Sequence, residues 1–186
     1  MEGSPMNDTT SLLRGLKDFK GPAPVHLWSP AHCGEIDIRI ARDGQWYHEG
    51  SPIQRPALMQ LFASVLRREP DGSYCLVTPV EKLTIQVDDC PFVAQLLECE
   101  GSGREQILRF TLNTGERVEA GVAHPLAVDI RDGEPHPVLP VRDGLDALLS
   151  RAVFYQLVEL AEREEVDGRE CLVVWSGGVK FMLGDT

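Results

Sequence analysis

The stretch Asp71–Val77 reads DGSYCLV, and it returns as DGRECLV at Asp167–Val173. From Asp71 to Asp167 the offset is 96 residues, and five of the seven positions are identical. Upstream of each copy, apolar residues follow the i, i+3, i+4, i+7 spacing of one helix face. They are Leu58, Leu61, Phe62 and Val65 before the first copy, and Phe154, Leu157, Val158 and Ala161 before the second. The chain is therefore predicted to contain an internal duplication.

Each copy is expected to form a hairpin, a helix and a second hairpin. The expected helices cover Pro56–Glu69 and Leu145–Glu165, and Asp-Gly turns follow both of them. Further strands at Phe92–Glu100, Gln106–Leu112 and Arg117–Val122 precede the second copy, and a proline-rich link (Pro135, Pro137, Pro140) leads into its helix. Segregated strands with few helices indicate an α+β fold of two related units.

The expected domain boundaries follow from these elements. Residues 1–24 are an appendage whose apolar positions predict a short docking helix, residues 25–90 are the first unit, and residues 91–186 are the second. The apolar positions of the appendage are Leu12, Leu13, Leu16 and Phe19. The segment Asp88-Asp89-Cys90-Pro91 marks the boundary between the units.

Composition excludes several classes of function. With 18 basic and 29 acidic residues the net charge is −11, which argues against nucleic acid and against anionic membranes as partners. No apolar run is long enough to span a membrane, and the N-terminus lacks the pattern of a signal peptide. An odd number of cysteines, five, without a Cys-x-x-Cys pair is typical of reduced thiols, so we expect a cytoplasmic location.

Cys33 is the residue that suggests an enzyme. Its thiol could act as a nucleophile with His26, His48 or His124 as the base, or join His26, His32 and His48 in a zinc site. The spacing matches no usual ligand pattern, and no neighbouring residue visibly activates the thiol. No catalytic residue, metal site or cofactor is predicted, and an enzyme that depends on Cys33 remains an alternative.

Two arginines indicate a binding site instead. Arg55 and Arg151 occupy the same place before the two apolar helices, where a guanidinium and free backbone N–H groups can hold an anion together. The predicted ligand-binding set adds hydrogen-bonding groups, further charges and an aromatic face: Thr78, Glu81, Lys82, Arg142 and Tyr155, with Trp28 as a second aromatic candidate. The competing interpretation is that each arginine forms a salt bridge within its own unit.

Three segments carry a family resemblance: CGEIDIRIARDGQWYHEGSPIQR (residues 33–55), DGSYCLVTPVEK (residues 71–82) and VDDCPF (residues 87–92). They resemble the bacterial family called domain of unknown function 1285, and RDGLDALLSRAVFYQLVELA (residues 142–161) extends the likeness more loosely. The resemblance implies two related α+β units, the second similar to pleckstrin-homology-like folds. It also implies a nucleotide-like ligand between the units and a role in signalling, with no established activity.

The leading hypothesis is a regulatory or sensor protein that binds a small, anionic, nucleotide-like ligand between its two units. The alternatives are a protein–protein interaction module without a small ligand and the enzyme that uses Cys33. A free sheet edge at Phe92–Glu100 would favour the interaction module.

Overall fold

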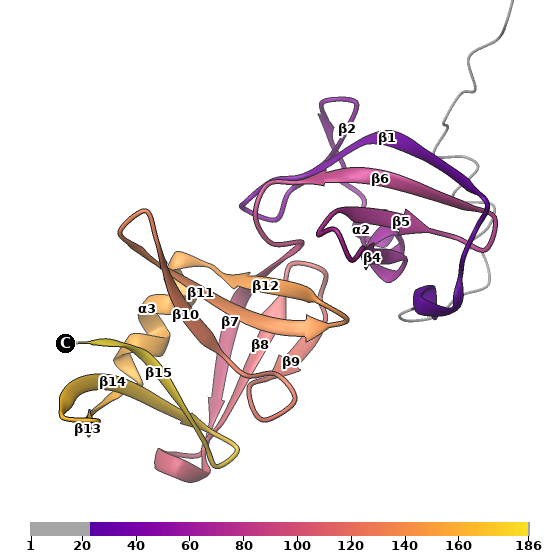
Figure 1. The fold of residues 1–186 in the computed structure, drawn as a ribbon. Helices are drawn as coiled ribbons and strands as arrows, with labels where there is room; N and C mark the ends of the chain where they lie inside the picture. The colour runs from indigo at the N-terminus through magenta and orange to yellow at the C-terminus, as the bar shows by residue number, and fades with distance from the viewer. Residues whose placement is uncertain (1–22, 186) are drawn as a thin grey trace, which may run out of the picture. The chain divides into compact units, whose positions relative to one another are not determined.

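The computed structural model describes residues 23–185, which form two compact units that divide between Asp88 and Asp89. Within these residues each unit contains one α-helix and a six-stranded sheet, and the second unit adds a sheet of three strands (Figure 1). The protein therefore has a two-domain, mixed helix-and-strand organisation. The docking helix expected around residues 12–19 lies outside the described residues, and the likeness to pleckstrin-homology folds stays a prediction.

The first unit is built on a sheet with the strand order β3-β2-β1-β6-β5-β4. Its elements are η1 (Val25–Leu27), β1 (His32–Ile40), β2 (Trp46–His48), β3 (Ser51–Pro52), α2 (Pro56–Ser64), β4 (Leu66–Arg68), β5 (Tyr74–Val77) and β6 (Glu81–Val87). Neighbouring strands run antiparallel except β1 and β6, which are parallel. The first and last strands of the unit therefore meet at the centre of its sheet.

Alternation along β1 creates the core of the first unit. Ile36, Ile38 and Ile40 are buried, whereas the residues between them are exposed, so one face of the sheet is apolar. The ring of Trp46 on β2 stacks on the ring of Phe62 in α2 with their centroids 6.2 Å apart. Burial of these large side chains holds the helix against the sheet.

The first helix is shorter than the sequence predicts. It ends at Ser64 instead of Glu69, and residues 66–68 form β4, which pairs antiparallel with β5. The N–H of Val65 bonds to the carbonyl of Phe62 and ends the helix. The apolar pattern that predicts a longer helix continues past its end, because Val65 at the C-cap and Leu66 in β4 are both buried.

The second unit has the strand order β10-β11-β12-β7-β8-β9 in one sheet and β13-β14-β15 in another. Its elements are β7 (Phe92–Glu100), η2 (Gly103–Glu105), β8 (Ile107–Leu112), β9 (Arg117–Glu119), β10 (Ala127–Arg131), β11 (Glu134–Arg142), β12 (Leu145–Leu149), α3 (Arg151–Glu159), β13 (Glu162–Val166), β14 (Arg169–Ser176) and β15 (Val179–Asp185). The parallel pair here is β12 with β7.

Two expectations for this unit are wrong. The helix expected over residues 145–165 is three elements, β12, α3 and β13, since Leu145–Leu149 extend the sheet and Glu162–Val166 pair with β14. The proline-rich link is strand β11. Prolines are tolerated in this strand partly because Pro140 adjoins a register shift against β12, where the regular ladder is already interrupted.

The repeated sequence corresponds to a helix followed by an antiparallel meander of three strands. In both copies the Asp-Gly pair makes a tight turn, with φ +88° at Gly72 and +79° at Gly168, a region that favours glycine. Cys75 and Cys171 are buried in the strand that follows. The copies differ in pairing: β4-β5-β6 joins the larger sheet through β1, whereas β13-β14-β15 is a separate sheet. In element order the second unit thus repeats the first, an antiparallel meander, a helix and a second meander, with β7, β8 and β9 ahead of it, but its last meander is not part of the six-stranded sheet.

The helices are too short to suggest membrane insertion. Each of α2 and α3 has nine residues, and residues 23–185 contain no helix with the length and apolarity needed to cross a bilayer.

Candidate functional site

A cavity of about 230 Å³ lies at the N-terminus of α2 in the first unit. Its lining comes from β2, β3, the link that follows β3, and the first two turns of α2: His48, Ser51, Pro52, Ile53, Gln54, Arg55, Leu58 and Phe62. None of these residues is acidic, although the chain contains 29 Asp and Glu residues. The cavity is therefore free of lining carboxylates that would repel an anion.

Arg55 holds the N-cap position of α2 without capping it. Its backbone is extended (φ −87°, ψ 111°), its carbonyl accepts hydrogen bonds from Leu58 and Met59, and its side chain makes no cap hydrogen bond. Pro56 follows with no N–H to satisfy, and the N–H of Ala57 has no partner within residues 23–185. The N-terminus of α2, which is the positive end of the helix dipole, therefore lies next to Arg55 and has no side-chain cap.

Arg55 forms no ion pair with any carboxylate of the described residues. The competing interpretation, an arginine neutralised within its own unit, is therefore not seen at this position in the described part of the chain. An exposed guanidinium without a carboxylate partner keeps its hydrogen-bond donors available to a ligand.

Arg151 is the first residue of α3, one position later along its helix than Arg55, which is the N-cap residue of α2. Ser150 caps that helix by accepting a hydrogen bond from the N–H of Val153 at 3.3 Å. Arg151 is exposed and also lacks an ion pair with the residues described, and Tyr155, one turn later, has 56% of its surface exposed. Matched arginines in the sequence thus begin one uncapped helix and one capped helix.

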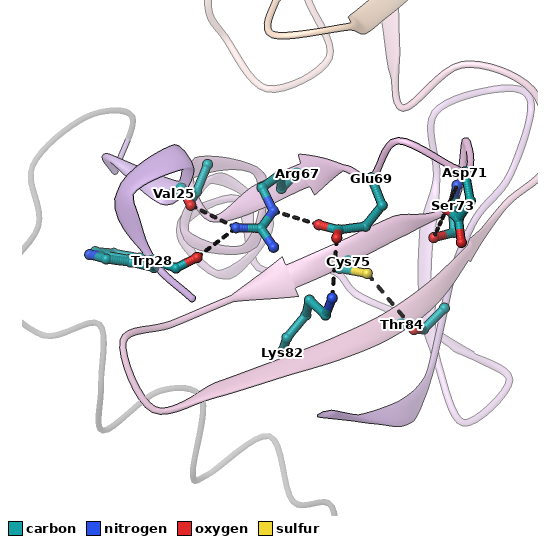
Figure 2. A network of polar contacts seen from close by, with 9 residues as sticks. All are labelled: Val25, Trp28, Arg67, Glu69, Asp71, Ser73, Cys75, Lys82 and Thr84. Carbon is teal, nitrogen blue, oxygen red and sulfur yellow. Dashed lines mark hydrogen bonds and ion pairs between the residues drawn. The ribbon is translucent and has the colours of Figure 1, made fainter. Parts of the chain in front are cut away.

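Lys82 belongs to a structural network in the first unit (Figure 2). Its Nζ lies 3.1 Å from Oε2 of Glu69, and Nε of Arg67 lies 2.5 Å from Oε1 of the same carboxylate. Nη1 of Arg67 also donates to the carbonyls of Val25 and Trp28, at 2.9 and 2.8 Å. The network fastens η1 to the sheet, and the charge of Lys82 is already matched by a carboxylate.

The pKa values in this network follow from the same contacts. Burial alone would raise the pKa of Glu69, but hydrogen bonds from Arg67 and Lys82 outweigh it and lower this pKa below its usual value. The hydrogen bond to Glu69, followed by its charge, raises the pKa of Lys82. Both groups are therefore held in their ionised forms.

Thr78 and Glu81 form the tight connection between β5 and β6. Thr78 is fully buried, and its hydroxyl accepts hydrogen bonds from the N–H groups of Val80 and Glu81, at 3.3 and 3.1 Å. The N–H of Thr78 donates in turn to the carbonyl of Glu81 at 2.8 Å. The hydroxyl that was predicted to bind a ligand is used inside the turn.

Arg142, on β11 of the second unit, is paired as well. Its Nη1 lies 2.5 Å from Oε2 of Glu116, and its guanidinium lies over the ring of Phe92, 5.0 Å from the centroid. Of the cationic residues predicted to hold an anion, Lys82 and Arg142 are ion-paired, whereas Arg55 lines a cavity.

Cys33 lies exposed on β1, in register with Lys82 on β6. Within residues 23–185 no hydrogen bond joins its thiol to a histidine. The geometry of the first unit therefore adds no support for a nucleophile at this position.

A buried group in the second unit was not predicted. Nε2 of His136 lies 2.8 Å from Oδ1 of Asp89, and Sγ of Cys90 lies 3.5 Å from the same oxygen. Burial, followed by the charge of Asp89, raises the pKa of the Cys90 thiol to about 12. That thiol stays protonated near neutral pH, so it is not a nucleophile.

No local sequence pattern predicts this group, because 47 positions separate Asp89 from His136. Asp89 and Cys90 were assigned to a boundary, and His136 lies between two prolines of the segment that was interpreted as a link. The segment is strand β11, and His136 is one of the side chains that this strand buries.

Comparison with known proteins identifies the family. Residues 23–90 match the domain of unknown function DUF1285, N-terminal domain, and residues 91–183 match the protein of unknown function DUF1285, C-terminal domain. No curated protein matches the chain.

Two crystal structures are similar. A DUF1285 family protein from Silicibacter pomeroyi is 46% identical, with 96% of each chain covered and a TM-score of 0.86. A DUF1285 family protein from Shewanella baltica is 28% identical, with 66% of this chain and 90% of that chain covered and a TM-score of 0.50. The chain therefore belongs to the DUF1285 family.

Proposed function

We propose that this protein is a regulatory or sensor protein that binds a small anionic ligand in the cavity at the start of α2. The observation that carries the proposal is the position of Arg55, which lines the cavity at an uncapped helix N-terminus. Backbone N–H groups and the helix dipole favour negative charge at such an end, and a guanidinium adds hydrogen bonds to it.

The charge of the whole molecule makes this local arrangement significant. A net charge of −11 repels anions on average, so an anion site requires a place where cations dominate. The cavity meets this requirement because its lining contains Arg55 and no carboxylate. Oxyanions such as phosphate and carboxylate fit the donor groups of arginine.

The remaining lining indicates what the anionic group is attached to. Ile53, Leu58 and Phe62 supply apolar surface, and Ser51 and Gln54 supply hydrogen-bonding groups. A volume of about 230 Å³ is below the ~300–1,000 Å³ typical of sites for drug-sized ligands. We therefore expect a ligand of mononucleotide size or smaller, with one anionic group and one flat or apolar part.

A thermal-shift experiment tests the proposal. Inorganic phosphate and the mononucleotides AMP, GMP, CMP and UMP are added to the full chain. A ligand present at 100 times its Kd stabilises a folded protein by about 2.7 kcal/mol, which corresponds to a rise in Tm of roughly 5–10 °C for a protein of this length. A flat response to every probe would contradict a phosphate site.

The chain offers a matched control for this experiment. Arg55→Ala removes the guanidinium in the cavity, and Arg151→Ala removes the equivalent one beside the capped helix. The proposal requires Arg55→Ala to lose the shift and Arg151→Ala to keep it. Equal loss in both variants would indicate binding to general surface charge.

A further inference from the structure

Three side chains of kinds that bind zinc converge in the second unit, outside the cavity at α2. The carboxylate of Asp89, the thiol of Cys90 and the imidazole of His136 place one ligand atom each within 4.8 Å of the others. We propose that these three residues bind one Zn²⁺ ion. This site shares no residue with the proposed anion cavity, so each proposal can fail without the other.

The geometry is close to what zinc requires. Zinc bonds of about 2.0–2.3 Å in a tetrahedral arrangement place neighbouring ligand atoms roughly 3.3–3.6 Å apart. Sγ of Cys90 already lies 3.5 Å from Oδ1 of Asp89, and Nε2 of His136 lies 2.8 Å from that oxygen. The distance between Nε2 of His136 and Oδ1 of Asp89 must lengthen for an ion to bind between them.

The fold fixes the ligands from two directions. Asp89 and Cys90 are adjacent residues immediately before β7, and His136 is on β11 of the same six-stranded sheet. His136 is 1% exposed, Cys90 is 7% exposed, and the Asp89 side chain is 11% exposed. Ligands held on a sheet and shielded from water are preorganised for a metal, which lowers the entropic cost of binding.

Charge balance favours an ion at this position. Zn²⁺ would displace the proton of the Cys90 thiol on binding, and the resulting thiolate and the Asp89 carboxylate would then balance the two charges of the ion, with imidazole as a neutral ligand. Oδ1 of Asp89 lies within hydrogen-bond distance of both the Cys90 thiol and Nε2 of His136. Nδ1 of His136 is buried and has no hydrogen-bond partner among the described residues.

Arg131 is a cation that lies beside the cluster. Its Nη1 is 3.6 Å from Oδ1 of Asp89, and its side chain is 58% exposed. An exposed arginine can turn toward solvent at small cost, because exposed ion pairs contribute little to stability. An arriving metal ion therefore competes with a weak partner.

The donor set selects the class of metal. A thiolate and an imidazole favour zinc over magnesium or calcium, which prefer oxygen ligands. Three protein ligands leave a fourth tetrahedral position for water or a further side chain.

Cobalt titration of the reduced, metal-free full chain tests the proposal, because Co²⁺ reports thiolate ligation by its charge-transfer absorption. We expect one equivalent of Co²⁺ to give that absorption with tetrahedral d–d bands, and one equivalent of Zn²⁺ to remove both. Cys90→Ser and His136→Ala are each expected to weaken Zn²⁺ binding at least tenfold in competition with a chelating dye. A spectrum without the thiolate band, or binding unchanged in Cys90→Ser, would overturn the proposal.

Matched variants separate ligand loss from misfolding. Cys171→Ser changes another buried thiol that lies 3.5 Å from a carboxylate, that of Asp185, and is expected to retain full Zn²⁺ affinity. His136→Cys keeps a zinc ligand at the position and should bind Zn²⁺ where His136→Ala does not. Binding that is lost equally in Cys171→Ser, or that His136→Cys fails to restore, contradicts the assignment.

Discussion

Nζ of Lys82 lies 3.1 Å from Oε2 of Glu69, and this contact changes the role of a residue that the sequence assigned to ligand binding. Glu69 also forms an ion pair with Arg67, and Arg67 donates hydrogen bonds to the backbone carbonyls of Val25 and Trp28 (Figure 2). Lys82 therefore takes part in the attachment of the N-terminal segment of the first unit to its sheet.

Glu69→Gln should destabilise the first unit. The substitution leaves Arg67 and Lys82 without their shared carboxylate, and loss of charge-assisted hydrogen bonds of this kind costs about 1–2 kcal/mol after allowance for solvent screening. Urea denaturation measures the change in midpoint. Glu119→Gln is the control: its partner Arg109 lies in an exposed pair, and a clearly smaller change in midpoint is expected there.

The pH dependence of stability should reveal the same carboxylate. The pKa of Glu69 is lower in the folded protein than in the unfolded chain, so its contribution is present above the unfolded pKa and is lost as the pH falls through the folded pKa. The free-energy difference between wild type and Glu69→Gln should shrink as the pH falls from about 5 to about 3. A difference that stays constant across this range would contradict the account.

The two Asp-Gly turns should tolerate alanine poorly. Gly72 and Gly168 have positive φ values, so Gly72→Ala and Gly168→Ala are each expected to cost about 1–2 kcal/mol through backbone strain. Gly121→Ala is the control, because its backbone is not in the left-handed region and an added Cβ meets no atom within 4 Å. Thermal denaturation of the three variants measures the contrast.

Ser150→Ala should destabilise α3 by about 1 kcal/mol, because it removes the oxygen that receives the N–H of Val153. Arg55→Ala, at the same position relative to the start of α2, removes no cap hydrogen bond and should change stability by less than about 0.5 kcal/mol. Denaturant midpoints of the two variants test whether the helix starts differ as described. Equal destabilisation would mean that Arg55 has a structural role.

Local patterns in the sequence predicted the strands of the repeats well. The Asp-Gly turns and the strands that contain Cys75 and Cys171 follow from turn chemistry and apolar runs. The length of the first helix was overestimated because Val65 and Leu66 continue the apolar pattern, although Val65 is the C-cap of α2 and Leu66 is already in β4. Tertiary pairing with β5 decides that outcome, and no local signal encodes it.

In the candidate site, too, local features follow from the sequence pattern, whereas contacts between distant segments do not. Arg55 was predicted because its position before the helix is visible in the sequence, and the open helix end beside it is a local property. The pairing of Lys82 with Glu69 and the approach of His136 to Asp89 depend on which strands become neighbours. Such contacts between distant segments require the sheet order, which the sequence pattern did not supply.

Isothermal titration calorimetry of wild type, Arg55→Ala and Arg151→Ala tests the central claim most directly, with the phosphate-bearing probe that gives the largest thermal shift. The account predicts that Arg55→Ala weakens binding roughly 10- to 100-fold, as expected for loss of a charge-assisted contact of about 1.5–3 kcal/mol, and that Arg151→Ala binds like wild type. An Arg55→Ala variant that binds the probe as tightly as wild type would contradict it.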